Sequence, residues 1–191
     1  MMSNHPVATI IMEHGAIITI ELFPEAAPNT VNSFIFLANS GTFDSHTIQR
    51  IVPGYVVDAS YNAFGQDICK YLIANEASSY CGTNNIKVEP GVIAMGGYDG
   101  EIAGGEFFFP LEYNEKLDGN YPAFGKIISS LDEILRWGKL PLRSVPYPQD
   151  PAIEINEPLE PLIIKSVRVE TFGVAYPPPE KLEMTKRPPS W

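Results

Sequence analysis

One arginine interrupts an otherwise apolar pair of predicted strands. The stretch TIQRIVPGYVVDA, residues 47–59, predicts two short strands joined by a turn at Pro53-Gly54, and Arg50 lies in the first strand. A guanidinium group is charged at every physiological pH, so burying it without a partner is costly. In most proteins such an arginine lies at a strand edge with its head in water. The alternative is a cationic hydrogen-bond donor beside an apolar pocket.

Two carboxylates and three aromatic residues accompany this arginine. Asp58 ends the second strand of the pair, and Glu106 precedes Phe107, Phe108 and Phe109 in another predicted strand. Because side chains alternate along a strand, either Phe107 with Phe109, or Phe108 alone, faces a pocket. Metal binding by Asp58 and Glu106 is set aside, since neither a histidine nor a third carboxylate stands at a suitable spacing.

The other reactive residue types predict no further chemistry. His5, His14 and His46 lie near the N-terminus or in turns, where we expect them to be solvated rather than catalytic. The spacing of Cys69 and Cys81 matches no zinc pattern, so we expect two free thiols in a reducing cytosol, with a disulfide as the alternative. No Ser-His-Asp or Cys-His arrangement is visible, and no cofactor or metal is predicted.

Composition limits the partners. The 191 residues suit one domain, and the 45% hydrophobic and 19% charged content is typical of a soluble globular protein. The net charge of −10 argues against a nucleic-acid partner, because phosphate binding needs clustered Lys and Arg. The first twelve residues lack the pattern of a signal peptide, and no apolar run is long enough for a membrane span. We therefore expect a cytoplasmic monomer.

Short strands and few helices make up the regular part of the chain. Strands are predicted at 7–12, 16–23, 90–95, 106–111, 123–128 and 162–172, in addition to the pair around Arg50. One helix starts at Pro28 and ends before Gly41, and a second spans 131–137 with Ser130 as its N-cap. This pattern predicts a mostly β fold, a closed eight-stranded antiparallel barrel with two helices capping its ends.

Three segments lack the regular spacing of apolar residues that marks a helix or a strand. Residues 61–89 are predicted to form a long surface excursion, and the Pro-rich stretch 138–161 shows neither a helix nor a strand pattern. The tail 173–191 contains Pro177–Pro179 and Pro188-Pro189 and is predicted to be extended or disordered. We therefore predict one barrel domain, residues 1–172, followed by a Pro-rich tail, residues 173–191.

The order of several motifs resembles the cyclophilins, a family of peptidyl-prolyl cis-trans isomerases, in a divergent, bacterial-like form. The matching pieces are IELFPEAAP (20–28), QRIVPGY (49–55), PGVIAM (90–95), GGEFFF (104–109), LDGN (117–120) and AFGKI (123–127). The match covers about residues 7–137, and the last predicted strand also fits. The resemblance implies an enzyme that isomerises Xaa-Pro bonds in polypeptides, assists protein folding and uses no cofactor.

The resemblance also assigns roles to particular residues. The active-site arginine of the family falls on Arg50. The proline pocket of the family falls on Tyr55, Val56, Phe108, Leu117 and Tyr121, of which Phe108 and Leu117 match the family residues. Two pocket glutamines fall on Asp58 and Glu106, and the pair that binds the substrate backbone falls on Gly96-Gly97. Elsewhere, Gln49 replaces a histidine, and Lys116 replaces the tryptophan associated with cyclosporin binding.

The altered pocket leaves alternatives open. The first function is a prolyl isomerase, favoured because Arg50, Phe108 and Leu117 are retained. The second is a proline-peptide binding module with weak or lost activity, and the third is a structural interaction domain with no specific support. Asp58 and Glu106 also allow two interpretations. In the first, both carboxylates pair with Arg50 or face water. In the second, they form an acidic wall that favours substrates with Lys or Arg beside the proline.

Overall fold

The structure is a computed structural model that describes residues 4–60, 66–147 and 150–183. Within these residues there are three α-helices and one 3-10 helix: α1 (Pro28–Asn39), α2 (Ser78–Cys81), α3 (Leu131–Trp137) and η2 (Asp67–Cys69). The strands are β1 (Val7–Met12), β2 (Ile17–Leu22), β3 (His46–Thr47), β4 (Arg50–Val52), β5 (Val56–Asp58), β6 (Leu72–Ile73), β7 (Val92–Tyr98), β8 (Glu101–Pro110), β9 (Ala123–Ser129), β10 (Leu142–Tyr147), β11 (Asp150–Pro158) and β12 (Ile163–Glu170).

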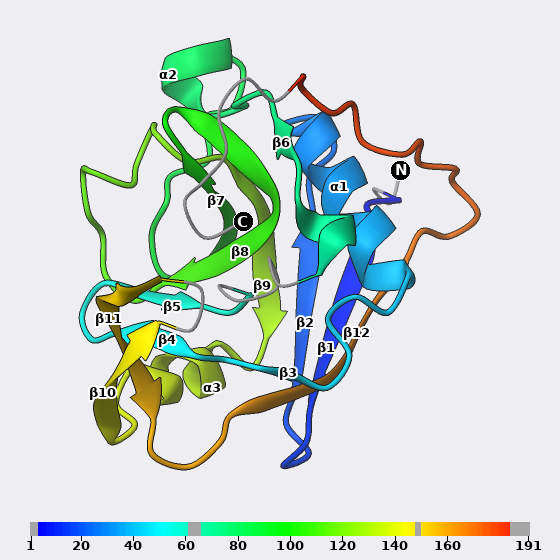
Figure 1. Ribbon diagram of the computed structural model, residues 1–191. Helices are drawn as coiled ribbons and strands as arrows, with labels where there is room; N and C mark the ends of the chain where they lie inside the picture. Colours follow the sequence, from blue (N-terminus) through cyan, green and yellow to red (C-terminus); the bar gives the residue numbers. More distant parts are fainter. Residues whose placement is uncertain (1–3, 61–65, 148–149, 184–191) are drawn as a thin grey trace.

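A single curled antiparallel sheet dominates the molecule (Figure 1). In the described residues it has ten strands in the order β3-β12-β1-β2-β9-β7-β8-β5-β4, with β6 paired to β8. The mostly β prediction is confirmed, whereas the closed eight-stranded barrel is wrong. The sheet ends at β3 and β4, and the extra strands β3 and β6 have two residues each, too few to show a period of two. The placement of two helices as end caps stays a prediction.

Alternation along β8 separates two apolar clusters. Phe107 and Phe109 enter the main core, where Phe107 meets Phe34 of α1 edge to face at 5.3 Å between ring centroids. Phe108 points to the opposite side of the strand and joins a smaller cluster with Val56 and Leu117. Each large apolar side chain buried in this way contributes about 1.5–3 kcal/mol. The strand therefore supports the core with one face and a second, smaller apolar surface with the other.

Helix α1 receives its N-terminal cap from a residue far along the chain. Pro28 lies in its first turn, as predicted, and Ala27 at the N-cap offers no side-chain acceptor. The carboxylate of Glu76 accepts hydrogen bonds from the Asn29 N–H at 3.0 Å, the Thr30 N–H at 2.8 Å and the Thr30 hydroxyl at 2.7 Å. A negative charge at this end also interacts favourably with the helix dipole.

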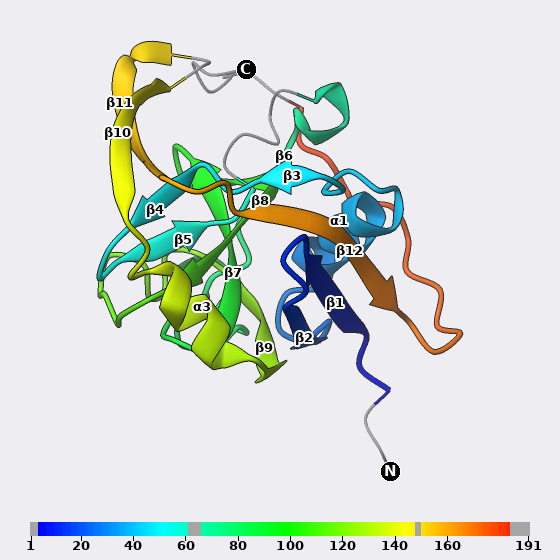
Figure 2. The same cartoon turned by 90° about the horizontal axis from the view of Figure 1, so that it is seen from below.

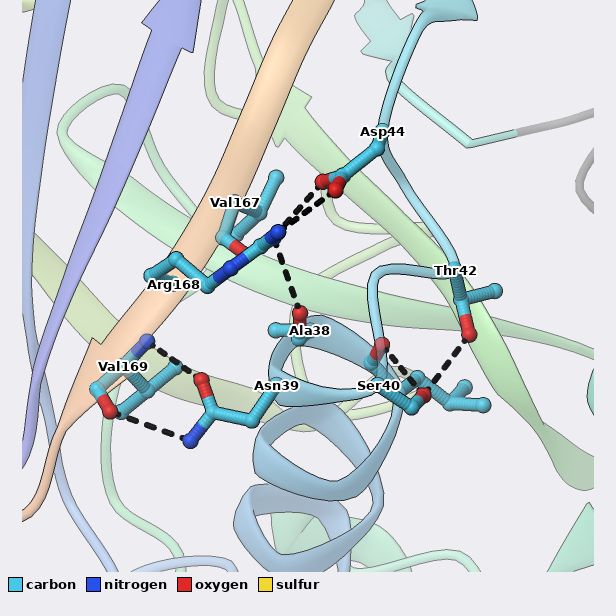
Figure 3. A network of polar contacts seen from close by, with 9 residues as sticks. Ala38, Asn39, Ser40, Thr42, Asp44, Val167, Arg168 and Val169 are labelled. Atoms are coloured by element: carbon cyan, nitrogen blue, oxygen red, sulfur yellow. Dashed lines mark hydrogen bonds and ion pairs between the residues drawn. The ribbon is translucent and has the colours of Figure 1, made fainter.

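The other end of α1 is attached to β12 (Figure 3). The amide of Asn39 pairs with the backbone of Val169, accepting from its N–H at 2.8 Å and donating to its carbonyl at 3.1 Å. Arg168 of the same strand donates to both carboxylate oxygens of Asp44, at 2.6 and 2.5 Å. This pairing lowers the pKa of Asp44. Gly41 follows the helix with φ +77°, as expected for a helix-ending glycine.

The predicted surface excursion, residues 61–89, lies partly inside the molecule. Residues 61–65 are outside the described residues, but Cys69, Leu72 and Ile73 are buried, and β6 pairs with β8. The surface prediction is therefore wrong for this part, because two adjacent apolar residues were too short a signal for a strand. Cys69 and Cys81 are free thiols, and burial raises the pKa of Cys69 to about 12.

The Pro-rich stretch 138–161 also differs from its prediction. Although residues 148–149 are outside the described residues, β10 and β11 form a two-stranded antiparallel ribbon beside β4, on the periphery of the molecule (Figure 2). Helix α3 occurs where predicted, but Ser130 makes no side-chain cap bond, because its backbone adopts φ +65°. None of the helices in the described residues is long and apolar enough to cross a membrane.

The described part of the tail, residues 173–183, lies along α1 and β6 without forming a helix or strand (Figure 1). The Glu180 backbone exchanges two hydrogen bonds with the Asn29 amide, at 2.8 and 2.9 Å. The Leu182 N–H donates to the Leu72 carbonyl at 2.9 Å, and the Lys181 ammonium lies 4.2 Å from the centroid of the Tyr71 ring. The predicted tail is thus attached to the domain over this range, and residues 184–191 are outside the described residues.

Candidate active site

A pocket of about 210 Å³ lies where β4, β5, β7 and β8 approach the loop after β8. The structure brings together here all ten residues that the sequence assigned to the site: Arg50, Tyr55, Val56, Asp58, Gly96, Gly97, Glu106, Phe108, Leu117 and Tyr121. They come from four strands and two connecting segments, so only the folded sheet places them side by side.

The smaller apolar cluster forms the floor of this pocket. Val56, Phe108 and Leu117 are almost fully buried, and Tyr121 packs edge to face on Phe108 at 5.8 Å between ring centroids. Of the two alternatives for the phenylalanine triplet, Phe108 alone faces the pocket. The resulting surface suits a compact apolar group, because a pocket lined by aliphatic and aromatic atoms offers contact without unsatisfied polar groups.

Arg50 and Asp58 form an ion pair in the lining of the pocket. They are cross-strand partners in the β4–β5 pairing, and the Arg50 Nη1 group donates to Asp58 Oδ2. The Arg50 side chain keeps 29% of its surface exposed, whereas the Asp58 side chain keeps 9%. Arg50 therefore combines features of both sequence interpretations, because it is partly exposed at an edge strand and also beside an apolar pocket.

The two carboxyl groups of the pocket have raised pKa values. Burial raises the pKa of Asp58, and the charge and hydrogen bond of Arg50 oppose this effect. Burial raises the pKa of Glu106 well above its ordinary value, the negative charge of Asp58 adds to the rise, and Arg50 opposes it. Glu106 therefore keeps its proton to a higher pH than an exposed glutamate does, which reduces the negative charge of the pocket.

Two glycines let the β7 backbone line the pocket. A Cβ atom on Gly97 would lie 2.0 Å from the Glu101 carbonyl oxygen, and one on Gly96 would lie 3.2 Å from the Glu106 side chain. The β7–β8 pairing also shifts register between Met95 and Gly97. Only glycine fits at position 97, whereas a Cβ at position 96 would require a small shift of Glu106.

The sequence alone did not single out several residues that hold the pocket in shape. The buried Ser60 hydroxyl donates to the Gly105 carbonyl at 2.6 Å and accepts from the Phe107 N–H at 2.8 Å, on both sides of Glu106. Asp118 accepts from the Val88 N–H at 3.0 Å and so fixes the loop that carries Leu117. The LDGN turn was a signal for Asp118, whereas nothing in the sequence distinguished Ser60 from other serines.

The histidines lie outside the pocket. His5 bonds to Glu21, and the exposed His14 bonds to Glu133, both on the molecular surface. The expectation of a solvated His46 is wrong, since this side chain is buried in β3, and its Nε2 atom has no hydrogen-bond partner among the described residues. Burial lowers the pKa of His46 to about 4, so the ring is neutral at physiological pH.

Comparisons with known proteins agree on one family. The family model of the cyclophilin-type peptidyl-prolyl cis-trans isomerases matches residues 7–169. Peptidyl-prolyl cis-trans isomerase B of Bacillus subtilis is 34% identical over 123 residues, which is 64% of this chain and 83% of that protein.

Solved structures show the same fold. A cyclophilin-type peptidyl-prolyl cis-trans isomerase of Cryptosporidium parvum superimposes with a TM-score of 0.67 at 20% identity, covering 87% of this chain and 98% of that one. A structure of the same protein in the presence of the dipeptide Ala-Pro superimposes with a TM-score of 0.65 at 20% identity, over 86% and 98% of the two chains.

Proposed function

Because the chain belongs to the cyclophilin-type peptidyl-prolyl cis-trans isomerases, we propose that Arg50 is its catalytic residue and that the other nine pocket residues bind the substrate. The observation that carries this proposal is the position of Arg50, whose partly exposed side chain lines the pocket beside its apolar floor. The substrates are polypeptides that contain Xaa-Pro bonds, and a role in protein folding is general in the family.

The reaction needs stabilisation of a twisted amide. Delocalisation of the nitrogen lone pair into the carbonyl gives the peptide bond a rotational barrier of about 18–20 kcal/mol. In the twisted transition state the prolyl nitrogen recovers its lone pair and can accept a hydrogen bond. A guanidinium directed at this nitrogen stabilises the twisted state more than either planar state, which is the requirement for catalysis.

The apolar floor supplies the second contribution. A charge-assisted hydrogen bond is worth about 1.5–3 kcal/mol, which is a small part of the barrier. Holding the prolyl ring on Phe108, Val56 and Leu117 while the preceding carbonyl rotates restricts the substrate to the reactive geometry. No nucleophile or covalent intermediate enters this scheme, since only rotation about one bond is required.

An isomerase assay with a matched pair of arginine variants tests the proposal. Arg50→Gln is expected to lower kcat/KM on a neutral Ala-Pro peptide by about 10- to 100-fold. This factor corresponds to the free energy of one charge-assisted hydrogen bond. Arg143→Gln is the control, because it removes an arginine from another carboxylate pair, with Glu157 on the β10–β11 ribbon. The double variant Arg50→Gln/Asp58→Asn checks that the loss of activity in Arg50→Gln does not come from leaving the Asp58 carboxylate buried and unpaired.

The outcomes separate two functions. If Arg50→Gln retains full activity while the unmodified protein isomerises the peptide, Arg50 is not the catalytic residue. If the unmodified protein binds the peptide without accelerating its isomerisation, the chain is the proline-peptide binding module considered above. A cytoplasmic location, a monomeric state and the division into residues 1–172 and 173–191 remain predictions.

A further inference from the structure

A second, smaller hollow adjoins the proposed proline pocket. Its volume is about 110 Å³, and it shares Gly97 and Tyr121 with that pocket. It lies between the β7–β8 turn and the segment that carries Asn75 and Tyr80. An apolar protein cavity of about 150 Å³ accommodates a benzene molecule. The second hollow is smaller than this, so it has room only for the end of one side chain of a peptide whose proline occupies the first pocket.

Two tyrosines and two carboxylates give this hollow its chemistry. Tyr80 and Tyr98 lie at its rim, with 54% and 37% of their surfaces exposed. Asp99 lies in the β7–β8 turn, and Glu101 is the cross-strand partner of Tyr98. Within the described residues, the lining contains no lysine or arginine. Aromatic faces and carboxylates attract the same kind of group, a cation on a flexible stem.

Backbone geometry and one amide fix the walls. Asp99 and Gly100 have φ values of +52° and +85°, as in the tight hairpin turns that Asp-Gly pairs form. The half-buried Asn75 donates from Nδ2 to the Gly100 carbonyl at 3.2 Å and to the Asn120 carbonyl at 3.0 Å. Asn75 thus connects the hairpin turn to the loop that leads to Tyr121. The hollow is formed before any ligand binds, which reduces the entropic cost of binding.

We propose that this hollow is a subsite for a Lys or Arg side chain of the substrate, held between Tyr80, Tyr98 and Glu101. The proposal rests on the proposed function, because the peptide is positioned by its proline in the first pocket. Glu101 is better suited to attract a cation than the two carboxylates of the first pocket. Asp58 already bonds to Arg50, and Glu106 is half-buried beside both of them.

The test measures binding separately from turnover. A peptide series places one Lys at each position from three residues before to three residues after the proline, and a second series replaces Lys by norleucine, which lacks the charge. Dissociation constants come from the shifts of the Tyr98, Gly100 and Glu101 backbone amides in NMR titrations at low salt. At one position Lys is expected to bind about fivefold more tightly than norleucine, and the difference should shrink with added salt.

Variants then locate the preference. Glu101→Gln and Tyr80→Leu are each expected to reduce the Lys-to-norleucine ratio from about fivefold to below about twofold. Glu13→Gln makes the same charge change on the exposed β1–β2 turn and should leave the ratio as it is. Glu106→Gln should also keep the ratio, because Glu106 lines the first pocket and not the second hollow.

The results distinguish the subsite from the proposed function. The subsite is wrong if Lys binds no better than norleucine at any position, or if the preference survives Glu101→Gln. If Lys binds preferentially through Glu101 but no peptide is isomerised, the subsite stands and the catalytic proposal fails. If no proline peptide binds at all, both proposals fail.

Discussion

At the scale of single residues, Asp58 has two opposing effects on Arg50. As its cross-strand and ion-pair partner it holds the Arg50 side chain at the pocket. In the proposed mechanism the same ion pair competes with the prolyl nitrogen for the guanidinium. Asp58→Asn keeps the size of the side chain and removes the charge. We expect this variant to isomerise neutral Ala-Pro peptides a few times faster, as measured by kcat/KM. A slower variant would mean that positioning by Asp58 outweighs the competition.

Glu106 gives the stability of the protein a pH dependence of known sign. The pKa of Glu106 is raised in the folded state. Its contribution to the free energy of unfolding is therefore complete below the ordinary pKa of 4.5, and it is lost as the pH rises through the folded-state pKa. Glu106→Gln does not titrate. We therefore expect the variant to be more stable than the unmodified protein at pH 8 in urea unfolding, with the difference vanishing near pH 4. Equal stability at both pH values would show that burial of Glu106 has no energetic effect.

His46 gives the stability of the protein a pH dependence of the opposite sign to that of Glu106. Its pKa falls from 6.5 to about 4 on folding, so below pH 6.5 the unfolded chain binds a proton that the folded protein does not. Stability should decrease as the pH falls from 6.5 to 4, by up to about 3 kcal/mol. His46→Gln should flatten this slope, whereas His14→Gln, at an exposed position, should keep it. An unchanged slope in His46→Gln would assign the acid sensitivity to other groups.

The residues that line the candidate site were predictable where motifs contained them. The motif order placed Arg50, Phe108 and Leu117, and strand alternation reduced the phenylalanine triplet to two alternatives. The hydrogen bonds of Ser60 and Asn75 depend on which backbone groups of β8 and its neighbours come close in space. A single sequence without motifs in that region does not contain this information. The same holds for His46, whose burial follows from the pairing of β3 with β12.

At the scale of elements, the N-terminus of α1 depends on Glu76. One carboxylate accepts three hydrogen bonds there, and Ala27 offers no substitute. Glu76→Ala is expected to lower the free energy of unfolding by about 1–2 kcal/mol, the range for loss of a helix cap. Glu89→Ala is the matched control, since Glu89 is exposed. A urea unfolding midpoint that is the same for both variants would contradict this role.

The β10–β11 ribbon shows why composition misled the interpretation of residues 138–161. Pro146, Pro151 and Pro158 lie within its strands, although proline is normally rare in strands. The ribbon tolerates them because it is a separate two-stranded sheet that has two edge strands. Its residues 151–154 are all exposed, so no alternation of buried and exposed positions marks the strand. Both signals on which strand prediction relies are thus missing here.

At the scale of the whole molecule, the sheet separates stability from chemistry. One side of β8 contributes Phe107 and Phe109 to the main core, and the other side presents Phe108 to the pocket. Substitutions on the pocket side therefore change recognition with limited effect on the core. The same division explains how the fold is kept while several pocket positions differ from the family pattern.

The tail stabilises this arrangement from outside the sheet. Residues 173–183 connect α1 to β6 through Glu180, Lys181 and Leu182, and β6 in turn pairs with β8. A chain that ends at Phe172 loses the two hydrogen bonds between Glu180 and Asn29, the backbone bond from Leu182 to Leu72, and the contacts of the Lys181 ammonium with the Tyr71 and Phe36 rings. We expect its free energy of unfolding to fall by about 2–4 kcal/mol. Amide hydrogen exchange at Leu72 and Ile73 should accelerate more than at Ile10 or Ile20 in the middle of the sheet.

A chain that ends at Glu183 is the matched control, because it keeps all of these tail contacts and lacks only residues 184–191. Its unfolding midpoint should lie above that of the chain ending at Phe172, and its amide exchange at β6 should be slower. If the chain ending at Phe172 unfolds at the same urea concentration as the one ending at Glu183, the tail contacts add nothing to the net stability. If both chains lose stability equally, the stabilising contacts lie beyond Glu183, and the role assigned to Glu180, Lys181 and Leu182 is wrong.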